Sequence, residues 1–129
     1  MIVLDTHVWL WWCDAPERLS EAARETVEAS ASVGVSTLSA WELATLVARG
    51  RISLDRDVGP WVRQALAAPR VQSLAPSAQV AVHAGLLDAR SFPGDPADRL
   101  IYATARSLGA TLVTRDQAIR AFDPAATLW

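Results

Sequence analysis

The sequence contains no lysine, and all twelve of its basic residues are arginine. This absence excludes a P-loop, whose Gly-Lys-Ser/Thr motif needs the lysine, and any chemistry that uses a lysine Schiff base. It also argues against receiver domains and aspartyl phosphatases, which use a lysine after a late strand. Arginine, by contrast, suits planar bidentate contacts with phosphate. Because the formal net charge is −2, any contact with nucleic acid must use a local basic patch or bound metal ions.

Cysteine and histidine are also scarce. Cys13 is the single cysteine, which rules out an internal disulfide and favours a reducing compartment. The two histidines have no thiolate cluster with which to build a zinc site. No apolar run approaches the roughly 20 residues of a membrane span, and the opening MIVLD has no features of a signal peptide. We therefore expect a cytoplasmic protein that does not enter a membrane.

The 129 residues contain no repeat, low-complexity tract or linker, so we expect one domain over residues 1–129. Strands are expected over 1–4, 32–36, 71–74, 111–114 and 126–129, and helices over 6–13, 20–30, 39–49, 58–68, 77–89, 95–108 and 117–122. Such alternation implies parallel pairing and a sheet covered on both faces. The expected fold class is α/β, with three layers and a central, mostly parallel sheet of four or five short strands.

Acidic residues follow several of these strands, at the sheet edge where open α/β folds bind ligands. Asp5 comes directly after the first strand, where a charge is costly unless it is solvated, paired or bound to a metal. The alternative is that Asp5 caps the helix that begins near Thr6. Asp116 follows the fourth strand and has the same alternative, as the cap of the turn that begins at Gln117. Local sequence leaves both readings open for each residue.

Glu42 has a structural alternative of its own. The segment Ser39-Ala-Trp-Glu42 matches a capping box, with serine at the cap and glutamate three residues later. Taken alone, this pattern favours the capping role. However, the helix that follows is apolar nearly all round, which indicates a buried helix and a Glu42 side chain that faces a pocket.

Two further acids open the helix expected over 95–108. Asp95 precedes Pro96, which is typical of an N-cap with proline at the first helical position, and we favour that structural role. Asp98 either interacts with the helix dipole or serves a site, because it lies at the border of the apolar stripe of this helix. We expect Asp98 to be the functional residue of the two.

Structural roles alone do not predict four acids at one edge of one sheet. Asp5, Glu42, Asp98 and Asp116 would repel one another there, and their pKa values would rise, unless a divalent cation neutralised the cluster. Ligation by carboxylates alone selects hard cations, Mg²⁺ or Mn²⁺.

Four segments that contain these acids are spaced along nearly the whole chain: Leu4-Asp5-Thr6-His7, Ser36-Thr-Leu-Ser-Ala-Trp-Glu42, Asp95-Pro-Ala-Asp-Arg-Leu-Ile101 and Leu112-Val-Thr-Arg-Asp116. In this order they resemble the successive motifs of the PIN-domain family, in particular its small VapC-type toxins. The resemblance implies a PIN-like fold. It also implies a metal-binding, catalytic set with two supporting residues: Asp5, Glu42, Asp98 and Asp116, with Asp95 as an adjunct and Thr6 as the hydroxyl that holds a metal-bound water.

The same resemblance implies an endoribonuclease that hydrolyses RNA phosphodiesters with a metal-activated water and acts as the toxin of a type II toxin–antitoxin pair. A VapB-like antitoxin and a homodimer are the implied partners. Arg99 and Arg115 adjoin two of the acids and are candidates for contact with RNA phosphates, although we favour a solvated outer helix face for Arg99. The alternatives are a PIN-fold nuclease of RNA processing and a catalytically silent binding module; Mg²⁺-dependent RNA cleavage would exclude the silent module.

Six tryptophans are unusual in a chain of this length. Trp9, Trp11 and Trp12 cannot all face inward on one short helix, because neighbouring residues point in different directions. We expect Trp9 and Trp12 in the core and Trp11 on the surface. The alternative is that part of this cluster forms an exposed apolar groove for a partner. The resemblance to the toxins implies that an antitoxin segment lies in this groove and directs its basic residues toward the acids.

Overall fold

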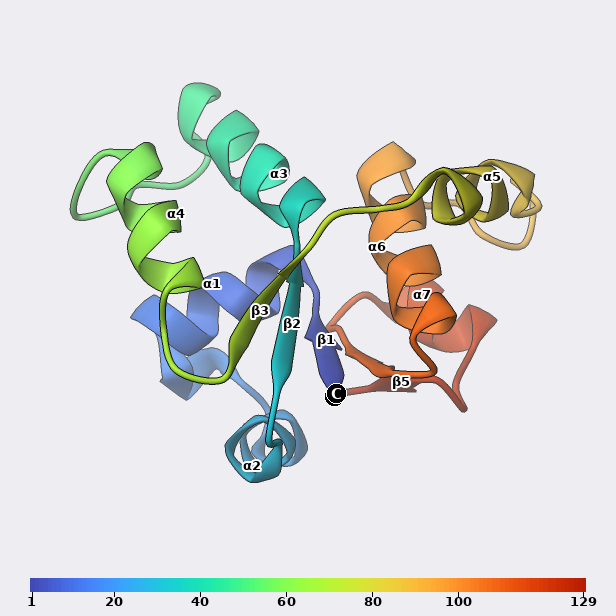
Figure 1. Cartoon of the computed structure of the whole chain (residues 1–129), viewed down its shortest axis with the longest axis horizontal. Coiled ribbons are helices and arrows are strands. Elements are labelled where there is room, and N and C mark those ends of the chain that lie inside the picture. The colour runs from blue at the N-terminus through green and yellow to red at the C-terminus, as the bar shows by residue number, and fades with distance from the viewer.

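The computed structural model describes residues 1–129 and places a five-stranded sheet between layers of helices (Figure 1). The strands are β1 (Ile2–Leu4), β2 (Val33–Ser36), β3 (Val71–Leu74), β4 (Thr111–Val113) and β5 (Thr127–Leu128). The helices are α1 (Thr6–Asp14), the 3₁₀ turn η1 (Pro16–Arg18), α2 (Glu21–Ala29), α3 (Thr37–Ala48), α4 (Val58–Leu66), α5 (Ala78–Leu86), α6 (Pro96–Ser107) and α7 (Gln117–Phe122). None of these helices has both the length and the apolar composition that crossing a membrane requires.

All five strands run parallel, in the spatial order β3-β2-β1-β4-β5. The central strand β1 pairs on both sides, with Leu4 opposite Val35 of β2 and opposite Val113 of β4. A parallel sheet brings the carboxyl ends of its strands to one edge, so the residues that follow β1, β2 and β4 start close together. The predicted α/β class is confirmed, and the sheet is parallel throughout.

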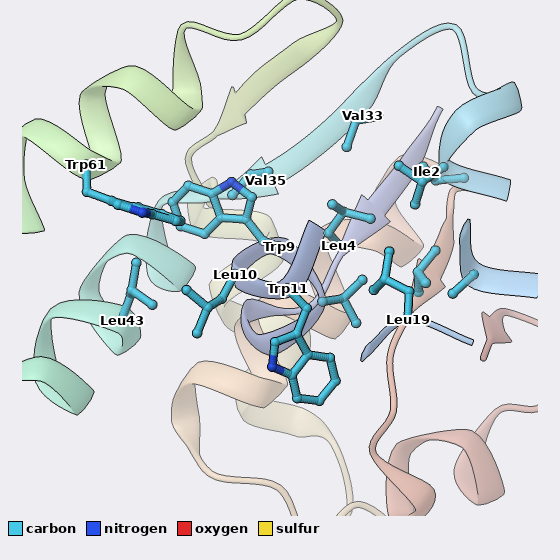
Figure 2. Packing of buried hydrophobic residues seen from close by; sticks show 14 residues of the cluster. Ile2, Leu4, Trp9, Leu10, Trp11, Leu19, Val33, Val35, Leu43 and Trp61 are labelled. Carbon is cyan, nitrogen blue, oxygen red and sulfur yellow. The ribbon is translucent and has the colours of Figure 1, made fainter. Parts of the chain in front are cut away.

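Alternate residues of β1 enter different cores, one on each face of the sheet. Ile2 and Leu4 pack into the larger core, which α1 to α4 cover, whereas Val3 packs against α6 and α7 on the opposite face. In the larger core, the buried Trp9 ring meets Trp61 of α4 edge to face, with 5.2 Å between ring centroids (Figure 2). This packing fixes α1 directly after β1 and therefore fixes the position of Asp5.

The tryptophans of α1 are arranged differently from the expectation. Trp9 is in the core as predicted, but the prediction of a surface Trp11 is wrong, since only 7% of this residue is exposed. Trp11 is covered by Trp129, whose ring centroid lies 6.0 Å away. Trp12 is half-buried beneath the Arg70 guanidinium. The helix therefore presents no exposed tryptophan groove, because its apolar side is already covered by this chain's own C-terminal residue.

Candidate active site

Three of the predicted acids converge at the carboxyl edge of the sheet. Asp5, Glu42 and Asp98 each offer one carboxylate oxygen, and these oxygens lie within 4.8 Å of one another. They line a cavity of about 690 Å³, which is within the usual range for ligand sites. The three residues come from the end of β1, from α3 and from α6, so only the folded chain assembles the cluster.

Asp5 takes the capping role that the sequence left open and also lines the cavity. One carboxylate oxygen accepts a hydrogen bond from the backbone N–H of Thr6 (2.8 Å) and so caps α1. The other accepts from the Thr114 hydroxyl (2.6 Å). Burial raises the pKa of Asp5, while the bonds from Thr114 and Thr6 lower it in part. The carboxylate is thus held in a fixed orientation toward the pocket.

Glu42 is free of any capping role, and the predicted capping box at Ser39 is wrong. The helix α3 begins at Thr37 and is capped by Ser36, whose hydroxyl accepts from the backbone N–H of Leu38. The fully buried Ser39 hydroxyl instead accepts from the hydroxyl of Thr6 (3.1 Å). The Glu42 carboxylate therefore faces the pocket, and burial, followed by repulsion from Asp5 among other acids, raises its pKa.

Asp95 and Asp98 form a reciprocal capping box at the start of α6. The Asp95 carboxylate accepts from the Asp98 backbone N–H (2.9 Å), and the Asp98 carboxylate accepts from the Asp95 backbone N–H (3.3 Å). The predicted N-cap role of Asp95 matches this geometry. Burial, then repulsion from Asp5, Asp95 and Glu42, raises the pKa of Asp98 to about 7. Ionising Asp98 so close to other carboxylates is unfavourable unless a positive charge compensates the repulsion.

Asp116 lines the same cavity but lies outside the three-residue cluster. Its carboxylate caps α7 and accepts from the backbone N–H groups of Ala118 (2.8 Å) and Ile119 (3.1 Å). Its own backbone N–H donates to the Thr114 hydroxyl (3.0 Å), which in turn donates to Asp5. The structure thus brings three of the four predicted acids together and connects the fourth to them through Thr114.

A family model of the PIN domain matches residues 2–124. The chain belongs to the PIN-domain family. It is 44% identical over 119 residues to Ribonuclease VapC22 of Mycobacterium tuberculosis, an alignment that covers 92% of this chain and 89% of that protein. The membership predicted from the ordered motifs is therefore confirmed.

Solved structures share this PIN fold over nearly their whole length. VapBC2 from Rickettsia felis, bound to a DNA fragment from its promoter, has a TM-score of 0.72 at 18% identity, with 99% of this chain and 98% of that chain covered. DNA-bound VapBC from Salmonella typhimurium has a TM-score of 0.71 at 21% identity, with the same coverage of 99% and 98%. At these identities the match concerns the fold, and it confirms the PIN-like architecture.

The two arginines next to the acids differ in what they contact in this PIN domain. The expectation that Arg99 lies on a solvated outer face is wrong. Its guanidinium donates to four backbone carbonyls, those of Ala84, Leu87, Phe92 and Gly94. Arg99 therefore ties α5 and the following loop to α6, and four of its five N–H donors are occupied. Arg115 is exposed at the cavity, and its guanidinium donates to no protein acceptor.

Several residues that line or support this PIN site are not among those predicted from the sequence. Thr114 and Ser39 carry buried hydroxyls that orient Asp5 and Thr6, and a buried hydroxyl always needs a partner. Their positions beside the motif acids were an available signal. Arg18 and Arg51 also line the cavity but belong to a turn and a loop far from any motif. Nothing in the spacing of these two arginines identifies them as residues of the cavity.

Proposed function

We propose that this PIN domain is a metal-dependent endoribonuclease, the toxin of a VapBC-like toxin–antitoxin pair. The observation that carries the proposal is the convergence of Asp5, Glu42 and Asp98 from three distant segments. It is supported by the 44% identity to a protein named as a ribonuclease and by structural neighbours that are toxin–antitoxin complexes. The RNA substrate would place the protein in the cytoplasm.

The residues of the cluster fit a hard divalent cation. Every side chain in it offers oxygen, and none offers sulfur or nitrogen, which favours Mg²⁺ or Mn²⁺ over zinc. Burial raises the pKa values of all three carboxyls, repulsion from neighbouring acids adds to this, and His7 offsets the effect only in part for Asp5 and Glu42. Asp5, Glu42 and Asp98 would hold the ion, with Asp116 at the margin. When bound, such an ion activates water at neutral pH and stabilises the charge on the leaving oxygen of a phosphodiester.

The chain's own residues keep the carboxylates in place. Thr114 and the backbone of Thr6 fix both oxygens of Asp5, and the Thr6 hydroxyl is itself fixed by Ser39. The Asp98 carboxylate is oriented by the backbone N–H of Asp95 through the capping box. These bonds preorganise the oxygens before any ligand enters, which reduces the reorganisation that binding requires. Asp95 supports the site through Asp98.

The test is the Asp5→Asn variant, compared with Asp57→Asn as a matched control. Asp57 is exposed, makes no side-chain cap bond and lies away from the cavity. We expect Asp5→Asn to retain its circular dichroism spectrum and to lose RNA cleavage by at least about a hundredfold, because it removes a charge that the ion needs. Asp57→Asn and wild type should cleave in Mg²⁺ and stop on addition of EDTA. A folded Asp5→Asn protein as active as the control would exclude the proposed site, and an inactive wild type would favour a silent module.

The partners follow from the same proposal. A cognate antitoxin is supported by the structural neighbours, which include a toxin–antitoxin complex from Klebsiella pneumoniae. The predicted groove of Trp9, Trp11 and Trp12 would offer this partner little ring surface, since Trp9 and Trp11 are buried. The homodimer implied by the family resemblance stays a prediction.

A further inference from the structure

Three arginines line the same cavity as the acids: Arg18 at the end of η1, Arg51 after α3 and Arg115 before α7. All three side chains are exposed. The ion pairs of the protein, Arg56–Asp55 and Arg106–Asp123, lie elsewhere, so none of the three is within 4.0 Å of a carboxylate. Their guanidinium groups also donate to no protein acceptor, in contrast to Arg99, and their donors are therefore free for a ligand.

Two of these guanidinium groups are held over one buried ring. The Cζ atom of Arg18 lies 5.3 Å, and that of Arg115 lies 5.6 Å, from the Trp11 ring centroid. Trp11 is itself fixed by packing against Trp129 and His7. Cation–π contact restrains an arginine without using its N–H donors. Part of the side-chain entropy that binding would cost Arg18 and Arg115 is thus already lost in the free protein.

The arginines do not serve to neutralise the acids. The three arginines line the same cavity as Asp5, Glu42 and Asp98, yet none of them lies within 4.0 Å of a carboxylate. Carboxylates therefore occupy one part of the cavity and unpaired guanidinium groups another. This division suits a ligand that presents a cation to the carboxylates and anions to the arginines, as a metal-bound polyphosphodiester does.

We propose that Arg18, Arg51 and Arg115, here called the arginine rim, bind the backbone phosphates that flank the phosphodiester to be cut, and that Trp11 is the positioning residue for Arg18 and Arg115. The inference rests on the proposed function and names its ligand as single-stranded RNA. The planar fork of arginine matches phosphate geometry. Because Trp11 is buried, its ring is not available for a base to stack on, and the three arginines themselves contact the backbone. With a net charge of −2, the chain depends on this local patch for RNA affinity.

The kinetic test compares Arg18→Gln and Arg115→Gln with Arg63→Gln. Arg63 is also exposed but lies on α4, outside the cavity, so its variant removes the same charge without touching the rim. We expect each rim variant to raise KM for an RNA oligonucleotide roughly tenfold with little change in kcat, because a charge-assisted bond to phosphate is lost. The plot of log(kcat/KM) against log[NaCl] should become shallower by about 0.7 per lost contact. Rim variants that match Arg63→Gln in KM and slope would overturn the proposal.

The positioning role of Trp11 must be tested by a measurement that a purely structural role would not change, and the salt slope is such a measurement. Trp11→Phe keeps an aromatic face and should retain the wild-type salt slope, whereas Trp11→Leu should make the slope shallower, as the two arginine variants do. If Trp11→Leu lowers only the Tm and leaves the slope unchanged, the positioning role is wrong.

A binding measurement tests the arginine rim separately from the proposed ribonuclease activity. Fluorescence anisotropy of a labelled single-stranded RNA of 12 nucleotides in EDTA reports binding without cleavage, for wild type and the three arginine variants. If Arg18→Gln and Arg115→Gln weaken RNA binding and Arg63→Gln does not, the arginine rim is supported even if no cleavage is found with Mg²⁺. Cleavage with Mg²⁺ together with equal binding by all variants would overturn the rim and leave the nuclease standing. A wild type that neither binds nor cleaves RNA would overturn both.

Discussion

Asp98 illustrates how a single carboxyl can couple this site to the stability of the fold. Its pKa is raised to about 7 by burial and by the neighbouring acids, whereas an unfolded aspartate titrates near ~4. Between these two values the folded protein binds a proton that the unfolded chain releases. The free energy of unfolding of the metal-free protein therefore decreases as pH rises through this window.

We expect the metal-free protein in EDTA to have a higher Tm at pH 5.5 than at pH 7.5. Asp98→Asn, which keeps an oxygen for the Asp95 backbone N–H, should reduce this difference but not abolish it, because the pKa values of Asp5 and Glu42 are also raised. The measurement is thermal unfolding by circular dichroism across this pH range, with Asp57→Asn as the control. If Asp98→Asn retains the full pH dependence of the control, the raised pKa of Asp98 is wrong.

Thr114 is the second residue with a testable role, because it connects two acids. Its hydroxyl donates to Asp5 and accepts from the backbone N–H of Asp116. Thr114→Val keeps the shape of the buried side chain and removes both bonds, so the pKa of Asp5 should rise further and its orientation should loosen. Losing such a supporting hydrogen bond costs about 10- to 100-fold in metal affinity. Calorimetric titration with Mn²⁺ should show this loss for Thr114→Val, while Thr114→Ser should bind nearly as wild type; equal affinity for all three would contradict the role.

At the scale of elements, local sequence predicts most of the helices and strands because their ends carry local chemistry. Gly50 and Gly109 follow α3 and α6 with φ of +67° and +61°, a conformation that glycine adopts without strain. The helices α2 and α5 begin after Ser20 and Ser77, whose hydroxyls accept from the third residue of the helix. Such signals lie within a few residues of the boundary that they determine, so one sequence is enough to locate them.

The errors at this scale come from contacts that are distant in sequence. Ser36 and Ser39 are both reasonable caps for α3, and the choice is made by Thr6, whose hydroxyl engages Ser39. Trp11 is buried because Trp129 packs against it from the opposite end of the chain. In the same way, local sequence offers Asp116 both as a site acid and as the cap of the turn at Gln117, and the structure shows that its carboxylate caps α7. No local pattern decides between such alternatives.

At the scale of the whole molecule, the acidic cluster forms only when the domain folds, so formation of the site and folding of the domain are one equilibrium. The unfolded chain separates Asp5, Glu42 and Asp98, and only the packing of α1, α3 and α6 around the end of β1 brings their oxygens within 4.8 Å. A cation that binds this cluster binds the folded state alone. It must therefore stabilise the entire domain, by an amount set by its concentration relative to its Kd.

We expect Mg²⁺ or Mn²⁺ at ten times its Kd to stabilise the protein by about 1.4 kcal/mol, which raises the Tm by roughly 4 °C for a domain of this size. The increase should be larger at pH 8 than at pH 6, because protons compete with the ion for carboxyls of raised pKa. Thermal unfolding with and without the ion, in the absence of RNA, measures this effect independently of catalysis. Glu42→Gln removes one ligand charge without disturbing a cap, so it should lose most of the increase, while Asp57→Asn should keep it. An equal increase in both variants would mean that the ion binds elsewhere on the domain, and the three carboxyls would then need another explanation for their convergence.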